Sequence, residues 1–227
     1  MSIEKNLFEE GRVVLIDKPF RWTSFDVVRK IRHLTRTKKV GHAGTLDPLA
    51  TGLLIICTGK FTKKINEYMA LEKEYTGHFV LGATTPTFDL ESKPENLMPI
   101  DTVSEESILR TAEKFKGNIQ QVPPAHSAVK VQGKRVYELA RQGKEVNLKP
   151  RNVFIKEFDI EKIQLPEVHF RIVCSTGTYI RSIADDFGKH LGCGAYLGSL
   201  CRTRIGGFLL KDAKKMETFA SETGISN

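Results

Sequence analysis

The segment from Gly41 to Cys57 constrains the fold more than any other part of the chain. It begins as Gly-His-Ala-Gly-Thr-Leu-Asp-Pro-Leu-Ala-Thr-Gly, a run of mostly small residues that holds one acid, Asp47. Five apolar residues, Leu53 to Cys57, follow without interruption. Such a run is typical of a buried strand. The segment therefore predicts a tight loop that carries a single carboxylate just before a buried strand.

Positive charge is concentrated immediately before this loop. The residues from Val27 to Leu46 contain no acid, and the whole chain of 227 residues has a formal net charge of +8. The basic residues of this stretch are Arg29, Lys30, Arg32, Arg36, Lys38 and Lys39. A concentrated basic surface attracts phosphate backbones, although many basic surfaces have no such partner. Asp47 is thus interpreted either as an acid that works beside a polyanion or as a loop residue that caps a turn before Pro48.

Strand and helix patterns follow one another without regular βαβ alternation, which favours an α+β fold. Strands are expected at 12–16, 53–57, 75–81, 127–131, 153–174 and 197–205. One helix is expected to begin at the capping box formed by Thr23 to Asp26, and another at Thr102 or Ser104. Two more helices are expected over 134–142 and 179–191. Residues 84–101 are expected to form a surface connection. No linker divides the chain, so we expect a single domain over residues 1–227.

Two helices are specified by the spacing of their apolar residues. The first is expected to bury Val27, Val28, Ile31 and Leu34, which leaves its basic residues to solvent or RNA. The second is expected to bury Ile108, Leu109, Ala112 and Phe115, with Gly117 just past its end. Both helices are therefore expected to be amphipathic.

The cysteines, the N-terminus and one lysine motif exclude several classes of protein. Cys57 and Cys174 lie in apolar runs, and the spacing of the four cysteines does not fit a zinc site. No signal region or membrane-length apolar run occurs, so we expect a cytoplasmic protein with reduced thiols. Thr58-Gly59-Lys60 is not a nucleotide-binding loop, because Phe61 stands where Ser or Thr would bind magnesium. Neither a metal nor a cofactor is expected.

Six segments together resemble the TruB family, the bacterial tRNA pseudouridine synthases that act in the T loop. They are Gly41 to Gly52, Asp17-Lys18-Pro19, Glu74-Tyr75, Ser127 to Lys130, Gly177 to Arg181 and Gly192 to Ala195. The resemblance implies a mixed, largely antiparallel sheet with a central cleft and flanking helices. Many members continue into a C-terminal PUA domain. This chain ends about twenty residues after Phe208, too few for another domain, so we expect no PUA domain.

The resemblance implies a catalytic set of Asp47, Tyr75 and Arg181. Asp47 would act at the ribose C1′, as nucleophile or as stabiliser of positive charge. Arg181 would pair with it and keep it ionised, although a surface arginine is the ordinary interpretation. A cation is unfavourable near a helix N-terminus, which weakens that interpretation. Tyr75 would stack on the base and take or relay the C5 proton, although a tyrosine on a strand is usually a core residue.

The resemblance also implies RNA-binding residues around the catalytic set. His42 would bind and flip the nucleotide, chiefly by stacking and hydrogen bonding, and Leu200 would wall the base pocket. Lys18 and Lys63 match basic positions near the site. Each has an ordinary alternative: a solvated turn histidine, a core leucine and two exposed lysines.

An RNA-gripping segment is expected around residues 123–150. Its basic and aromatic residues suit phosphate contact and base stacking. They are Lys130, Lys134, Arg135, Tyr137 and Arg141. A solvated amphipathic helix explains the same pattern equally well. His126 stands where relatives often carry tyrosine.

The resulting hypothesis is an isomerase that converts the T-loop uridine at position 55 of tRNA to pseudouridine. The base must leave its stack, and this flipping costs about a few kcal/mol. The expected partner is the T arm of tRNA, with no membrane and no obligatory protein partner, and the expected state is a monomer. The alternatives are a non-catalytic RNA-binding or tRNA-folding protein on the same scaffold, and an RNA-guided relative.

Overall fold

The computed structural model describes residues 3–124, 130–131, 134–135 and 148–223. The chain forms two compact units. The first consists of residues 1–76 and 200–227, and the second of residues 77–199. Strands β4 (Lys73–Leu81) and β10 (Ala195–Ile205) contribute residues to both units. The expectation of a single domain therefore stays a prediction, and each unit is described separately.

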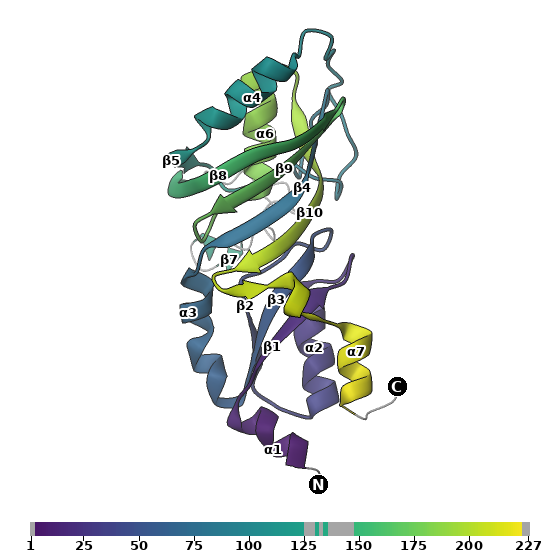
Figure 1. Cartoon of the computed structure of the whole chain (residues 1–227), viewed down its shortest axis with the longest axis vertical. Helices are drawn as coiled ribbons and strands as arrows, with labels where there is room; N and C mark the ends of the chain where they lie inside the picture. Colours follow the sequence, from purple (N-terminus) through teal and green to yellow (C-terminus); the bar gives the residue numbers. More distant parts are fainter. Residues whose placement is uncertain (1–2, 125–129, 132–133, 136–147, 224–227) are drawn as a thin grey trace. The chain divides into compact units, whose positions relative to one another are not determined.

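The first unit is a mixed sheet with helices on both faces (Figure 1). Its strand order is β12-β1-β3-β10, with β2 on β3 and β11 on β10. The strands are β1 (Val13–Lys18), β2 (Val40–Ala43), β3 (Thr51–Thr58), β11 (Phe208–Leu209) and β12 (Lys214–Lys215). The helices are α1 (Ile3–Glu10), α2 (Ser24–Thr35), η1 (Gly59–Lys64), α3 (Ile65–Ala70), η2 (Leu210–Asp212) and α7 (Met216–Glu222).

Burial on both faces explains the apolar run of β3. Leu54 and Ile56 pack with residues of α1, α2 and α7, whereas Leu53, Ile55 and Cys57 pack with residues of η1 and α3. Successive side chains of a strand point to opposite faces, so a strand covered on both sides has no polar positions. The buried strand predicted from the sequence is confirmed.

Helix α2 forms as its sequence predicts. Thr23 is the N-cap and closes a capping box with Asp26. The four predicted core residues, Val27, Val28, Ile31 and Leu34, are all buried. The opposite side of the helix, which carries Arg29 and Arg32, faces solvent.

The second unit packs two helices on one face of a largely antiparallel sheet (Figure 1). Its strand order is β10-β4-β9-β8-β5, and β6 pairs with β7 separately. The strands are β5 (Gly117–Gln121), β6 (Lys130–Val131), β7 (Lys134–Arg135), β8 (Arg151–Gln164) and β9 (Glu167–Cys174). The helices are α4 (Glu105–Lys114) and α6 (Ile180–Leu191). Their shared core is aromatic and contains Phe79, Phe115, Phe158, Phe170 and Phe187. The predicted α+β class with a mixed, largely antiparallel sheet is confirmed.

Two predictions in the second unit were wrong. Leu109 was predicted to be buried but is 45% exposed. The buried face of α4 carries Ile108, Thr111 and Ala112, and residue 109 lies about 100° around the helix from residue 108. The segment 84–101 is more than a surface connection, since Asp89 is buried within it along with Thr85 and Thr87.

Two further predictions concern the ends of elements. Lys134 and Arg135 belong to strand β7 and not to the start of a helix, and the rest of the predicted helix lies outside the described residues. The strand predicted over 197–205 is not the last one, because the short strands β11 and β12 follow it.

Candidate active site

Asp47 lies in the connection between β2 and β3, between two buried anchors. Leu46 and Ala50 are each only 3% exposed, while Asp47 is half-buried. The Ala50 backbone N–H donates to the carbonyl oxygen of Asp47 at 3.1 Å and closes a turn. The main chain of Asp47 thus forms the turn that is expected of an Asp-Pro pair. Its buried neighbours fix the backbone position from which the carboxylate extends.

The start of α2 holds the Asp47 loop in place. The Ser24 Oγ donates to the Leu46 carbonyl oxygen at 3.1 Å and accepts from the Leu46 N–H at 2.8 Å. The Arg21 N–H donates to the carbonyl oxygen of Pro48 at 2.8 Å. Each such hydrogen bond contributes about 1 kcal/mol net. The loop is therefore ordered before any ligand arrives.

Lys18 is fully buried at the end of β1 and lies close to Asp47. Its Nζ donates to the carbonyl oxygens of Pro19 at 2.9 Å, of Trp22, and of Pro48 at 3.3 Å. Burial lowers the pKa of Lys18 to about 8, and Asp47 is the charged group that most opposes this shift. The ordinary interpretation of Lys18 as an exposed lysine is wrong. The structure thus places a buried cation close to the Asp47 carboxylate.

Arg202 on β10 ties this loop to the sheet, and the sequence analysis missed it. It is 1% exposed, its Nε donates to the Leu53 carbonyl oxygen at 2.8 Å, and its Nη2 donates to the Gly44 carbonyl oxygen at 3.0 Å. At Gly52, whose φ is +97°, a Cβ would lie 2.4 Å from the Arg202 carbonyl oxygen. Glycine at 52 therefore lets β10 approach the loop. Only Gly44 and Gly52 in this segment could have hinted at this contact.

His42 lies on β2, three residues before Thr45. Its Nδ1 is buried and makes no well-formed hydrogen bond within the described residues. Burial and then the nearby Arg202 lower the pKa of His42, while the Gly44 backbone opposes the shift. The lowered pKa favours the neutral ring near pH 7. This environment differs from that of the solvated turn histidine considered above.

Tyr75 and Leu200 lie on the two strands that follow the loop in the sheet order. Tyr75 is 8% exposed on β4, and Leu200 is half-buried on β10. The Thr51 hydroxyl donates to the Leu200 carbonyl oxygen at 3.5 Å, and Thr51 pairs in register with Cys201. Leu200 is therefore brought next to the end of the Asp47 loop. The roles of Tyr75 and Leu200 toward a base stay predictions.

Lys63 is not brought to the Asp47 loop. It is exposed on η1, which follows the opposite end of β3 from the loop. The eight residues of β3 span about 26 Å at 3.3 Å per residue. A role in RNA binding stays a prediction for Lys63, but a place beside the catalytic acid does not fit its position.

Arg181 belongs to the second unit, where it is buried in the first turn of α6. Its Nε lies 3.6 Å from the Asp89 Oδ2, and its Nη1 donates to the Thr87 carbonyl oxygen at 3.2 Å. Both members of the ion pair are about 95% buried. Asp89 thus offsets the unfavourable position of a cation at a helix N-terminus. The sequence analysis missed Asp89, and the pairing of Arg181 with Asp47 stays a prediction.

The RNA-gripping segment is only partly described. Lys130 lies on β6, and Lys134 and Arg135 lie on β7, the two strands of a small antiparallel ribbon. His126, Tyr137 and Arg141 lie outside the described residues. The predicted RNA contacts of this segment therefore stay predictions.

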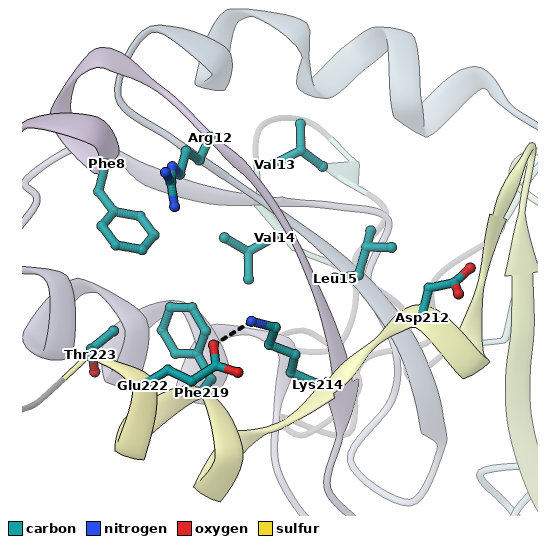
Figure 2. Close-up of a pocket in the computed structure, with 10 residues that line it drawn as sticks. All are labelled: Phe8, Arg12, Val13, Val14, Leu15, Asp212, Lys214, Phe219, Glu222 and Thr223. Carbon is teal, nitrogen blue, oxygen red and sulfur yellow. Dashed lines mark hydrogen bonds and ion pairs between the residues drawn. The ribbon is translucent and has the colours of Figure 1, made fainter. Parts of the chain in front are cut away.

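Figure 2 shows a separate pocket of about 290 Å³ beside β1, η2 and α7. Phe8 and Phe219 line it, and an ion pair of Lys214 with Glu222 lies at its side. No residue of the Asp47 loop lines this pocket. The candidate active site is therefore the loop itself, with Lys18, His42 and Arg202 around it.

Within the described residues, no group of three His, Cys, Asp or Glu side chains is placed to hold a metal ion. The four cysteines form no disulfide bond, and Cys57, Cys174 and Cys193 are buried. No described helix is long and apolar enough to cross a membrane.

Comparison with known folds gives the class of protein. The chain matches the structure titled "Crystal Structure of a Cbf5-Nop10-Gar1 Complex" with a TM-score of 0.75 and 28% identity, over 99% of this chain and 60% of that chain. It matches "Structure of H/ACA RNP bound to a substrate RNA containing 2'-deoxyuridine" with a TM-score of 0.71 and 26% identity, over 97% of this chain and 57% of that one. The model of the TruB family pseudouridylate synthases, N-terminal domain, matches residues 32–180. The fold and the Asp47 loop thus define a pseudouridine synthase.

Similar sequences identify the family. A protein of Flavobacterium johnsoniae called "tRNA pseudouridine synthase B" is 51% identical over 92% of this chain and 95% of its own length. A protein of the same name from Phocaeicola vulgatus is 50% identical over 93% of both chains. The chain belongs to the TruB family.

Proposed function

We propose that this chain is a tRNA pseudouridine synthase that isomerises the T-loop uridine at position 55. The supporting relatives are called tRNA pseudouridine synthase B and match this chain over nearly all of their length. The observation that carries the proposal is the fixed loop of Asp47, which has the buried ammonium of Lys18 beside it. A carboxylate presented in this way suits chemistry at a sugar carbon that develops positive charge.

The reaction moves one glycosidic bond and leaves the composition unchanged. The bond from C1′ to N1 of uridine breaks, the base turns, and a bond from C1′ to C5 forms. The C5 proton leaves and N1 gains a proton, so no oxidant or group donor is needed. Asp47 acts at C1′ as nucleophile or stabiliser, and Tyr75 takes or relays the C5 proton.

The neighbours of Asp47 suit the steps around this exchange. The ammonium of Lys18 lies on one side of the Asp47 carboxylate, and we propose that Arg181 pairs with this carboxylate as well. The neutral ring of His42, with its buried Nδ1, suits a hydrogen bond or a stacking contact with the flipped nucleotide. Leu200 walls the base pocket, close to Thr51.

The T arm of tRNA is the proposed partner. We propose that the enzyme works as a monomer in the cytoplasm, without an obligatory protein partner. Four free cysteines fit a reducing compartment.

The test is incubation of the protein with an unmodified tRNA transcript, followed by chemical mapping of pseudouridine. A single new pseudouridine in the T loop, at position 55, is the expected result. Tight tRNA binding without any pseudouridine would contradict the proposal and favour a non-catalytic RNA-binding protein.

A further inference from the structure

We propose that the exposed side of α2 forms a second RNA-binding surface, which holds the phosphates of nucleotides next to the target uridine. The surface comprises Arg21, Trp22, Phe25, Arg29, Lys30 and His33, and is called the α2 surface below. It contains no residue of the Asp47 loop. The inference rests on the proposed function, because its ligand is the RNA substrate of the same enzyme.

The α2 surface contains a pocket with an excess of positive charge. The pocket has a volume of about 530 Å³ and is lined by Arg21, Trp22, Asp26, Arg29, Lys30 and His33. Asp26 is its only acid, and this carboxylate already accepts from the Thr23 N–H at 2.9 Å and from the Arg29 guanidinium at 2.7 Å. Because no acid follows until Asp47, the field over α2 attracts an anion.

The helix itself does not explain where these charges lie. Cations near a helix C-terminus are stabilised by the helix dipole, but this effect is confined to the last turn. Arg32 and His33 lie in that turn, whereas Arg29 and Lys30 are the sixth and seventh of twelve residues. Arg29 is 71% exposed on its side chain, and its pairing with Asp26 lies at the surface. Such a pair contributes little to stability.

Exposed aromatic rings accompany the positive charge. Phe25 is 59% exposed and Phe20 is 55% exposed, both within the turn and first residues of α2. Arg21 lies over the Phe20 ring, 5.6 Å from its centroid. Proteins that bind single-stranded nucleic acid combine basic residues with aromatic rings on which bases stack. This combination favours RNA over a purely anionic small molecule.

The α2 surface begins where the catalytic loop is anchored. The backbone of Arg21 donates to Pro48, next to Asp47, and the Trp22 carbonyl oxygen accepts from the ammonium of Lys18. Arg21 and Trp22 therefore line the pocket and also contact Pro48 and Lys18, which lie next to Asp47. A nucleotide held at Asp47 would place its neighbours in the RNA chain within reach of α2.

The salt dependence of tRNA binding tests the α2 surface. The Arg29→Gln, Lys30→Gln double variant should weaken binding to unmodified tRNA and reduce the slope of log Kd against log salt by about one per lost phosphate contact. The matched control is Lys114→Gln, Lys116→Gln, which removes two exposed charges at the end of α4 and just after it, one of them also paired with an acid at the surface. The control should keep the slope of the wild-type protein. The control should also keep the single-turnover rate of the wild-type protein at saturating RNA, because it removes no residue of the Asp47 loop.

A crosslink then locates the RNA that occupies the surface. Phe25→p-benzoylphenylalanine should crosslink to nucleotides within a few positions of the target uridine. The same change at Met69, which is 40% exposed on α3 across the sheet from α2, should not. An unchanged salt slope in the double variant, or crosslinks only at distant nucleotides, would overturn the proposal. Failure of the wild-type protein to form pseudouridine would instead overturn the proposed function, so the two failures are distinguishable.

Discussion

The guanidinium of Arg202 donates a hydrogen bond to the carbonyl oxygen of Gly44 across 158 positions of sequence. A second bond, from its Nε, reaches the Leu53 carbonyl oxygen on β3. Gly44 and Leu53 flank the loop that carries Asp47, so one buried side chain fixes both ends of that loop. We infer that Arg202 is a positioning residue for the catalytic acid.

Replacement of Arg202 should therefore slow the reaction without preventing RNA binding. Arg202→Met leaves two buried carbonyl oxygens without their donor, and each loss costs about 1–3 kcal/mol of stability. We expect the single-turnover rate of the folded variant to fall at least tenfold, equivalent to ~1.4 kcal/mol, with little change in Kd for tRNA. Arg204→Met on the same strand is the control, because Arg204 pairs with Glu72 at 3.0 Å and touches no residue of the loop. Equal rates for the two variants would refute the positioning role.

The rate should depend on the protonation of Lys18. Its pKa in the folded protein is about 8, so the cation beside Asp47 is lost as pH rises through that value. We expect the single-turnover rate of the wild-type protein to fall above about pH 8 as this charge is lost. This fall of the rate above pH 8 should be absent from Lys18→Met, whose rate should be low at every pH. If the rate of Lys18→Met still fell above pH 8, the pH dependence would belong to another group.

Stability should also change with pH at Lys18, in a direction that the pKa shift fixes. The folded pKa of about 8 lies below the ordinary value of 10.5. Between these values the unfolded chain holds a proton that the folded protein has lost, so the contribution of Lys18 to stability rises with pH. Below about pH 8 the cost of burying the charge is complete. The unfolding free energy of wild type minus that of Lys18→Met should therefore increase from pH 8 to 10.5, as chemical denaturation at several pH values can measure.

Arg181 should be required for activity, and Asp89 should be required to hold it. Arg181→Met should remove most activity, and Asp89→Asn should lower the single-turnover rate at least tenfold because the guanidinium loses its buried partner. Asp185→Asn is the matched control, since Asp185 is also buried and pairs with the exposed Lys189. We further expect a crystal structure with RNA to place Arg181 within roughly 4 Å of Asp47. An Arg181 side chain far from Asp47 in that complex would contradict this model of the site.

Local sequence patterns predicted most of the elements. The capping box at Thr23 and the spacing of Val27, Val28, Ile31 and Leu34 specify α2 through contacts within a few residues. The run from Leu53 to Cys57 specifies a strand that is covered on both faces. The burial predicted for Leu109 was wrong, because a helix with apolar residues at both 108 and 109 can turn either side chain toward the core.

The supporting residues of the site could not be predicted in the same way. Lys18, Asp89 and Arg202 are charged residues that became buried only through contacts with distant or irregular segments. Arg202 meets Gly44 across 158 positions of sequence, and Arg181 meets Asp89 across about two fifths of the chain. The spacing of apolar residues along the chain does not indicate such contacts. Because charged residues are rarely buried unless they are paired, their burial was not expected. The resemblance named the reacting groups and Lys18, while the structure adds Asp89 and Arg202.

The most direct test of this account is the amount of pseudouridine formed by Asp47→Asn with an unmodified tRNA transcript at equimolar enzyme. Asparagine has nearly the size of aspartate but cannot act as an anion at C1′. We predict no pseudouridine above background, with Kd for tRNA within about threefold of the wild-type value, ~0.65 kcal/mol. Asp212→Asn, which changes an exposed acid outside the loop, should react like wild type. A rate near that of the wild-type protein in Asp47→Asn would contradict the assignment of Asp47 as the catalytic acid.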